Sequence, residues 1–166
     1  MIYTENTKKA IKLAYDKHHG QFDKEGLPYI HHPFHLAECM TDEDSTCVAL
    51  LHDVLEDTDT TIDDIVSLGF NTSVIEALKL LNHDSKVDYY SYVANLSNNI
   101  LAVKVKIADL KHNSDLSRVS EITDSVLLRK EKYDKCLSFL EKQLLCLQNN
   151  DIEGLNNNIK TFLDIN

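Results

Sequence analysis

The chain has 166 residues, 43% of them hydrophobic, with only four glycines, two prolines and no tryptophan. This composition fits one compact helical domain better than a disordered chain or a glycine-rich β-sandwich. Seventeen basic and twenty-seven acidic side chains give a net charge of −10, which argues against binding to nucleic acid or to an anionic membrane.

Targeting signals and cysteine motifs are not apparent in the sequence. The segment MIYTENTKKAIK has no apolar run, and no other stretch approaches the ~18 apolar residues that cross a bilayer. We therefore expect a cytoplasmic protein. The cysteines lack C-x-x-C spacing, which indicates buried free thiols rather than disulfides or a thiolate zinc site. They are Cys39, Cys47, Cys136 and Cys146. No pattern specifies the oligomeric state.

Apolar residues recur at helical spacing along most of the chain. The pattern predicts helices over residues 5–18, 33–40, 41–58, 60–70, 71–82, 86–97, 98–113 and 123–148. Thr4 is the expected cap of the first helix, Gly26 and Pro28 interrupt the chain with a loop, and Pro33 opens the second helix. Valine and isoleucine in residues 100–107 also permit a strand there, although helix is the preferred interpretation.

The predicted fold class is all-α. We expect one helical domain over residues 1–148. The asparagine-rich segment 149–166 predicts a short C-terminal helix or a frayed tail, which we assign to the same domain. The sequence contains neither an internal repeat nor a low-complexity linker.

The segment LLHDVLEDT, residues 50–58, places four ionisable side chains among leucines and a valine. On a continuous helix, His52 lies over Glu56 and Asp53 lies over Asp57, because residues four apart share a face. Burying such charges without partners costs several kcal/mol for each one, which is comparable to the stability of a small domain. A compensating partner is therefore expected.

A divalent metal ion is the expected partner, since neutral imidazole and carboxylate groups are both good metal ligands. His32 lies where the loop meets the second helix, and Asp109 lies among aliphatic residues with Asn113 one turn later. The candidate ligands are His32, His52, Asp53 and Asp109. Two nitrogens and two oxygens without thiolate suit Mn²⁺ or Fe²⁺, and Zn²⁺ stays open.

Glu56 and Asp57 are the candidate catalytic residues, one turn beyond the ligands. A carboxylate there can orient or deprotonate a water molecule and later protonate a leaving oxygen, which predicts a hydrolytic reaction. Other polar and aromatic residues receive structural interpretations. We interpret His18 as a partly exposed residue near a helix end, and Tyr89 and Tyr92 as packing residues.

Three segments together resemble the HD-domain metal-dependent phosphohydrolases, most closely those of the RelA/SpoT type and their small single-domain relatives. The segments are HGQFDKEGLPYIHHP, LLHDVLEDT and KIADLKHN, in this order between residues 19 and 113. The resemblance implies an all-helical HD fold with one metal ion, typically Mn²⁺, bound by His32, His52, Asp53 and Asp109. It also implies catalytic roles for Glu56 and Asp57, and a substrate-positioning role for Asn113.

The reaction of that family removes pyrophosphate from the 3′ position of guanosine 3′,5′-bis(diphosphate), or ppGpp, the alarmone of the stringent response. The expected partner is therefore a small phosphorylated nucleotide. One position departs from the family, because Asp23 stands where the alarmone hydrolases carry an arginine that lies against the base. Lys24, the next residue, is a candidate phosphate contact. Two alternatives stay open: hydrolysis of another nucleotide or phosphate ester, and a non-catalytic HD domain that binds a nucleotide or a protein partner.

Overall fold

A computed structural model describes residues 1–165 of the chain. Within this range the chain forms helices and no strand, apart from a single bridge between Phe22 and Pro28. The all-α fold class is therefore confirmed. The helices fall into two compact units, residues 1–82 and 83–166, which we describe separately. Our prediction of a single domain with a boundary at residue 148 stays a prediction. Among the described residues, none of the helices combines the length and apolar character needed to span a membrane.

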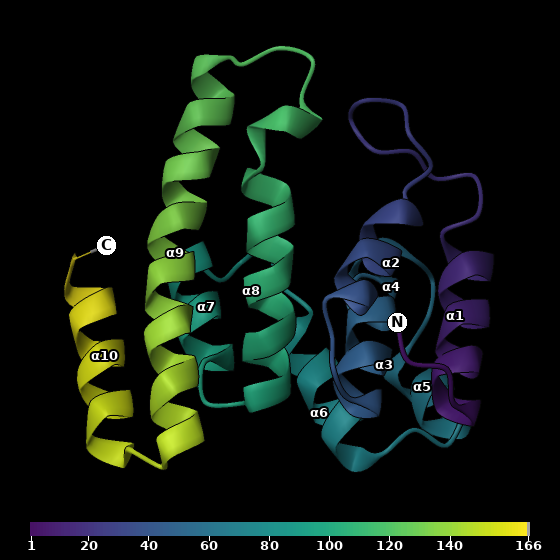
Figure 1. The fold of residues 1–166 in the computed structure, drawn as a ribbon, viewed down its shortest axis with the longest axis horizontal. Helices are drawn as coiled ribbons and strands as arrows, with labels where there is room; N and C mark the ends of the chain where they lie inside the picture. Colours follow the sequence, from purple (N-terminus) through teal and green to yellow (C-terminus); the bar gives the residue numbers. More distant parts are fainter. Residues whose placement is uncertain (166) are drawn as a thin grey trace. The chain divides into compact units, whose positions relative to one another are not determined.

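The first unit contains six helices (Figure 1). They are α1 (Glu5–Lys17), α2 (His31–Glu38), α3 (Glu43–Leu51), α4 (Val54–Asp57), α5 (Ile62–Ser67) and α6 (Thr72–Leu81). Helix α3 packs against α1, α2 and α6. Its residues 45–51 are all buried, which explains why residues 47–51 are hydrophobic on every side of the helix. This buried helix fixes the position at which His52 and Asp53 leave its end.

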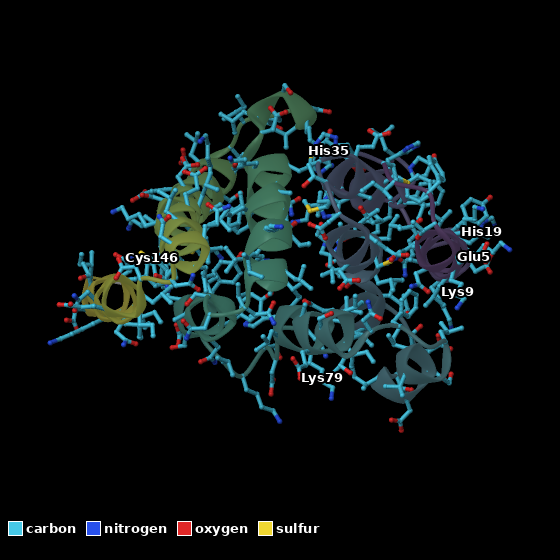
Figure 2. The ribbon with its side chains drawn as sticks, turned by 60° about the horizontal axis from the view of Figure 1, so that its bottom comes forward. Glu5, Lys9, His19, His35, Lys79 and Cys146 are labelled. Atoms are coloured by element: carbon cyan, nitrogen blue, oxygen red, sulfur yellow. The ribbon has the colours of Figure 1, made fainter. Side chains whose placement is uncertain are left out.

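Helix α1 begins where the sequence predicted, at the cap Thr4. The Thr4 hydroxyl accepts from the N–H of Thr7, and the Thr7 side chain accepts from the N–H of Thr4. Such a reciprocal box satisfies two of the N–H groups that a helix start leaves without partners. Figure 2 shows Glu5 and Lys9 on the same side of α1, from which Lys9 Nζ donates to the Leu68 carbonyl at the end of α5 at 3.3 Å.

Helix α2 begins two residues earlier than predicted, at His31 rather than at Pro33. Pro33 is its third residue, where proline is tolerated because the first N–H groups of a helix have no partner within the helix. His32 consequently lies in the first turn of α2. The predicted place of His32 at the start of a helix is confirmed, with this shift in the boundary.

The second unit contains four α-helices and one short 3₁₀ turn. They are α7 (Tyr89–Leu96), α8 (Ile100–Ser114), η1 (Leu116–Arg118), α9 (Asp124–Asn149) and α10 (Ile152–Ile165). Helix α9 lies between α8 and α10, and α10 also contacts α7 (Figure 1). Residues 100–107 belong to a helix, so the alternative of a strand there is excluded.

The C-terminal segment forms helix α10, one of the two predicted alternatives, and this helix packs on α9. Phe139 and Phe162 stack with ring centroids 4.0 Å apart. Cys146 of α9 faces α10 and accepts from the Asn158 amide at 3.5 Å (Figure 2). A methyl group on Gly154 would lie 2.2 Å from Asp151 Oδ2 and 2.8 Å from Cys146 Sγ, so these side chains would have to move. The absence of a side chain at Gly154 permits this close contact.

All four cysteines are free. Cys47 and Cys136 are buried, as predicted. Cys39 is exposed and Cys146 is partly exposed, so the prediction of burial was wrong for Cys39. Cys39 follows the last residue of α2 and lies on the solvent side of its end, which sequence spacing alone did not indicate.

Candidate metal centre

Three side chains of the first unit converge on one point. The Nε2 atoms of His32 and His52 are 3.2 Å apart. Asp53 Oδ2 lies 2.9 Å from His52 Nε2 and 3.6 Å from His32 Nε2. His32 is 5% exposed and His52 is 4% exposed, so little water reaches their nitrogens. Two imidazoles and one carboxylate thus meet in a largely dehydrated place, as their predicted roles require.

The convergence depends on a break in the helix that the sequence predicted to be continuous. Helix α3 ends at Leu51, and α4 begins at Val54. His52 Nδ1 lies 2.9 Å from the carbonyl oxygen of Ala49, which in an unbroken helix would accept from the N–H of Asp53. The imidazole competes for this carbonyl, and the chain turns at His52 and Asp53. The predicted single helix over residues 41–58 was therefore wrong.

The same contact decides which nitrogen of His52 is available. A carbonyl only accepts hydrogen bonds, so Nδ1 carries the proton and Nε2 presents its lone pair toward His32 and Asp53. Metal-binding histidines typically donate their second N–H to a backbone carbonyl in this way. A neutral imidazole beside a carboxylate is a donor set that divalent cations bind well, and these residues therefore fit a metal ion.

Asp57 lies close to His52 and Asp53, and both residues affect the pKa of its side chain. Burial and the negative charge of Asp53 raise the pKa of Asp57 above its ordinary 3.8, although His18, His52 and a hydrogen bond with Tyr29 act in the opposite direction. The backbone N–H of Asp57 donates to the carbonyl of Asp53 at 2.9 Å, so the two aspartates are four residues apart on one turn, as predicted.

Glu56 is an exposed residue of the same short helix. It follows the break between α3 and α4, and its predicted pairing with His52 stays a prediction. The catalytic role of Glu56 stays a prediction.

A short hairpin leads the chain from α1 into α2. The N–H of Tyr29 donates to the carbonyl of Gln21 at 3.0 Å, and the N–H of Asp23 donates to the carbonyl of Leu27 at 2.8 Å. Asp23 Oδ1 accepts from the N–H groups of Glu25 and Leu27, both at 2.9 Å. Asp23 therefore stabilises the turn at the tip of the hairpin, a role common for aspartate and unsuited to arginine.

Lys24 lies at this tip and is exposed. Gly26, two residues on, has a φ of +79°, a conformation that glycine adopts without strain. The hairpin thus places Lys24 in solvent, where its amino group is available to an anionic ligand.

Tyr29 is a residue of the site that the sequence interpretation missed. Its hydroxyl donates to Asp53 Oδ2. The only signal was its place in the quoted segment PYIHH, three residues before His32, which by itself indicates packing. His18 was also misjudged, because it is 1% exposed rather than partly exposed, and its ring packs on Tyr29.

Asp109 belongs to the second unit and is held by its own helix, α8. Lys106 Nζ lies 2.8 Å from Asp109 Oδ2, and the Asn113 amide donates to Asp109 Oδ1 at 2.5 Å. Asp109 is 5% exposed. The predicted pairing of Asp109 with Asn113 one turn later is present, and this contact orients the carboxylate that the sequence assigned to the metal.

Lys106 is a second residue that the sequence interpretation missed. Its ammonium group lies 5.6 Å from the ring centre of Tyr89 and 5.2 Å from that of Tyr92. Burial by itself lowers the pKa of Lys106, but the charge of Asp109 and the two tyrosines outweigh it and hold the pKa well above the usual value. Tyr89 and Tyr92 therefore do more than fill space, since their rings help to stabilise a buried cation.

Comparison with known proteins assigns the chain to a family. The model of the HD domain matches residues 10–111, more than half of the chain. The chain belongs to the HD domain family. The matched region contains all four candidate ligands, and the predicted resemblance is confirmed.

Two curated relatives of this HD domain have long chains. The chain is 35% identical over 121 residues to the bifunctional (p)ppGpp synthase/hydrolase SpoT of Escherichia coli strain K12. This match covers 64% of this chain and 17% of that protein. It is 38% identical over 93 residues to a guanosine-3′,5′-bis(diphosphate) 3′-pyrophosphohydrolase of Aquifex aeolicus strain VF5, covering 54% of this chain and 13% of that protein. The chain thus spans only a small part of the length of these relatives.

A solved structure shares the fold of the whole HD chain. It is that of a metazoan ortholog of SpoT described as hydrolysing ppGpp, and it covers 99% of this chain and 97% of its own. The TM-score is 0.64 at 22% sequence identity, a likeness that establishes the fold.

Proposed function

We propose that this HD domain is a metal-dependent phosphohydrolase that removes the 3′-pyrophosphate group of ppGpp. The observation that carries the proposal is the convergence of His32 Nε2, His52 Nε2 and Asp53 Oδ2 within 3.6 Å of one another. The names of the relatives from Escherichia coli and Aquifex aeolicus supply the substrate.

The proposed cofactor is one divalent cation, Mn²⁺ in first place, with Fe²⁺ and Zn²⁺ as alternatives. His32, His52 and Asp53 would hold it, and Asp109 is the proposed further ligand. All four offer nitrogen or carboxylate oxygen and no thiolate, which favours Mn²⁺ or Fe²⁺ over structural zinc. When bound, such a cation polarises a phosphate group and makes water easier to deprotonate.

The residues of the chain divide the remaining work. Asp57, whose pKa is raised, is suited to accept a proton from the attacking water and to return it to the leaving oxygen. Glu56, in the same turn, is the proposed second carboxylate for proton transfer. Lys24, exposed at the hairpin tip, is proposed to bind a phosphate, and Asn113 is proposed to position the substrate while holding Asp109.

A second candidate function keeps the site and changes the substrate to another nucleotide or a phosphate ester. Asp23 favours it, because its carboxylate is engaged in the turn and cannot supply the planar cation that stacks on a base. A third candidate is a non-catalytic HD domain that binds a nucleotide or a partner. The cytoplasmic location remains our prediction from the sequence.

The test is a hydrolysis assay with the purified protein and Mn²⁺ on a panel of ppGpp, other nucleotides and simple phosphate esters. Asp53→Asn keeps the shape of the side chain and removes its charge, so activity should fall by more than the ~10–100-fold typical of changes around a metal ligand. Asp63→Asn is the matched control, since Asp63 is exposed on α5 and should leave activity unchanged.

Each outcome separates the candidates. Turnover of ppGpp that depends on Asp53 supports the proposal, and turnover confined to other compounds supports the second candidate. Activity that survives Asp53→Asn contradicts the metal mechanism. Binding of nucleotides without turnover of any compound, in protein shown to contain a divalent metal, supports the non-catalytic candidate.

A further inference from the structure

The Tyr29 side chain connects several parts of the candidate metal centre. Its hydroxyl donates to Asp53 Oδ2, the oxygen that faces His32 Nε2 and His52 Nε2. The same hydroxyl interacts with Asp57. Tyr29 thus contacts both the carboxylate assigned to the metal and the carboxylate assigned to proton transfer.

The contact with Asp53 is compatible with metal binding. A carboxylate oxygen has two lone pairs, so Oδ2 can accept from Tyr29 and still offer a lone pair to a cation. Without the Tyr29 hydroxyl, the aspartate side chain can occupy other rotamers, in which Oδ2 does not face the imidazoles. A hydrogen bond to an ionised carboxylate is strong enough to select one orientation.

The Tyr29 ring is itself held on two sides. The ring of His18 lies 5.0 Å from it and that of His32 lies 5.7 Å from it, centre to centre. His32 in turn lies 5.1 Å from His52. Four aromatic rings therefore follow one another from the end of α1 to the converging nitrogens. The hairpin hydrogen bond from the Tyr29 N–H to Gln21 holds the backbone at the same place.

His18 supports this arrangement at a cost. Gln21 Nε2 donates to the carbonyl of Asp57 at 3.1 Å, so its Oε1 faces His18 Nδ1 at 2.7 Å and accepts from it. This leaves His18 Nε2 as a buried acceptor with no hydrogen-bond partner among residues 1–165. Such an atom is unfavourable, and two contacts of the ring offset it. One is the tilted contact of its ring with that of Tyr29. The other is its hydrogen bond to Gln21, which links α1 to the end of α4.

We propose that Tyr29 is a positioning residue of the metal centre: its hydroxyl holds Asp53 Oδ2 in the orientation that binds the cation, and His18 holds the Tyr29 ring from behind. The inference rests on the proposed metal site. Tyr29 does not itself contact the cation in this scheme, and it acts through Asp53.

The test is a calorimetric titration with Mn²⁺ alone, without nucleotide, on the full chain. Tyr29→Phe keeps the ring between His18 and His32 and removes only the hydroxyl, so the protein should fold. We expect Mn²⁺ affinity to fall by about 10–100-fold, the usual effect of removing a hydrogen bond to a metal ligand. Tyr15→Phe is the control, since Tyr15 is exposed on α1. The Mn²⁺ affinity of this variant should match that of the wild type within about two-fold.

A purely structural role predicts a different pattern. Binding is measured at a temperature at which circular dichroism shows each variant fully folded, so a loss of stability does not enter the dissociation constant. His18→Leu, which keeps the hydroxyl and removes the supporting ring, should weaken Mn²⁺ binding by a smaller factor than Tyr29→Phe.

Three results would overturn the proposal. The first is an unchanged affinity in Tyr29→Phe when the wild type binds Mn²⁺, which removes the role of Tyr29 and leaves the metal site intact. The second is a larger loss in His18→Leu than in Tyr29→Phe, which shows that the hydroxyl is not the positioning group. The third is a wild type that binds no Mn²⁺, which removes the metal site and this inference together.

Discussion

Lys106 offers a quantitative test of how α8 stabilises a buried carboxylate. The substitution Lys106→Met keeps a long unbranched side chain between Tyr89 and Tyr92 and removes the ammonium group that lies 2.8 Å from Asp109 Oδ2. The side chains of Lys106 and Asp109 are 12% and 7% exposed, so water cannot replace the lost partner. The variant therefore leaves a buried negative charge beside two aromatic rings.

The expected cost follows from this burial. Removing one partner of a buried ion pair typically costs 3–5 kcal/mol. Asn113 still donates to Asp109 Oδ1 in the variant, so we expect the lower end, about 3 kcal/mol of unfolding free energy. Lys111→Met on the same helix is the matched control. The ammonium of Lys111 lies 2.9 Å from Glu141, but both side chains are about half exposed, and such pairs contribute about 0–1 kcal/mol.

The assay is urea unfolding followed by circular dichroism, with a chelator present so that no metal ion compensates the charge of Asp109. The double variant Lys106→Met/Asp109→Asn should recover much of the loss, because replacing both partners removes the unpaired charge. A loss below about 1 kcal/mol in Lys106→Met, equal to that of Lys111→Met, would refute the reasoning that the pair is effectively buried.

Two further predictions concern Asp57 and the cysteines. Burial and the charge of Asp53 raise the pKa of Asp57 in the folded state above its unfolded value, so stability falls as the pH rises through that window. Asp57→Asn should raise the melting temperature of the chelator-treated protein at neutral pH, with the difference vanishing below about pH 4; a lower melting temperature at neutral pH contradicts the shift. Burial, with the charges of Glu43 and Asp44, raises the pKa of Cys47 to about 12, whereas Cys39 is exposed. A thiol reagent at neutral pH should label Cys39 in the folded protein and Cys47 only in urea, and rapid labelling of Cys47 without urea would disprove its burial.

The helices could be predicted because their signals are local. Thr4 and Thr123 accept from the N–H groups of Thr7 and Val126, as helix caps do, and the apolar spacing between caps fixes the helical period. The valines and isoleucines of residues 100–107 permit either a strand or a helix. Helix was preferred because the apolar residues recur at helical spacing. The structure confirms that choice.

The break at His52 could not be predicted from periodicity, because it depends on a side chain that competes with the backbone. His52 Nδ1 lies beside the Ala49 carbonyl, the oxygen that accepts from the N–H of residue 53 in a continuous helix. The types of the candidate metal ligands were evident from the sequence, since buried charge requires a partner. The backbone turn that brings their side chains together was not evident from the sequence.

Tyr29 and Lys106 were missed for a common reason. A tyrosine beside a proline and a lysine within an apolar helix both have ordinary interpretations, as packing and as surface charge. Their roles depend on contacts with residues that are distant in sequence, which for Lys106 are Tyr89 and Tyr92. Tyr29 contacts Asp53, 24 residues away, and such a contact leaves no local pattern.

The hairpin between α1 and α2 is held together in two places, at its base and at its tip. Its base is closed by a main-chain hydrogen bond between Tyr29 and Gln21, which does not depend on the side chains at the tip. The tip is held separately, by the Asp23 carboxylate and the positive φ of Gly26, so the exposed Lys24 can be exchanged while the hydrogen bond at the base stays in place. Under the proposed function, Lys24 is therefore a position at which contacts with a ligand can be changed without disturbing the base of the hairpin.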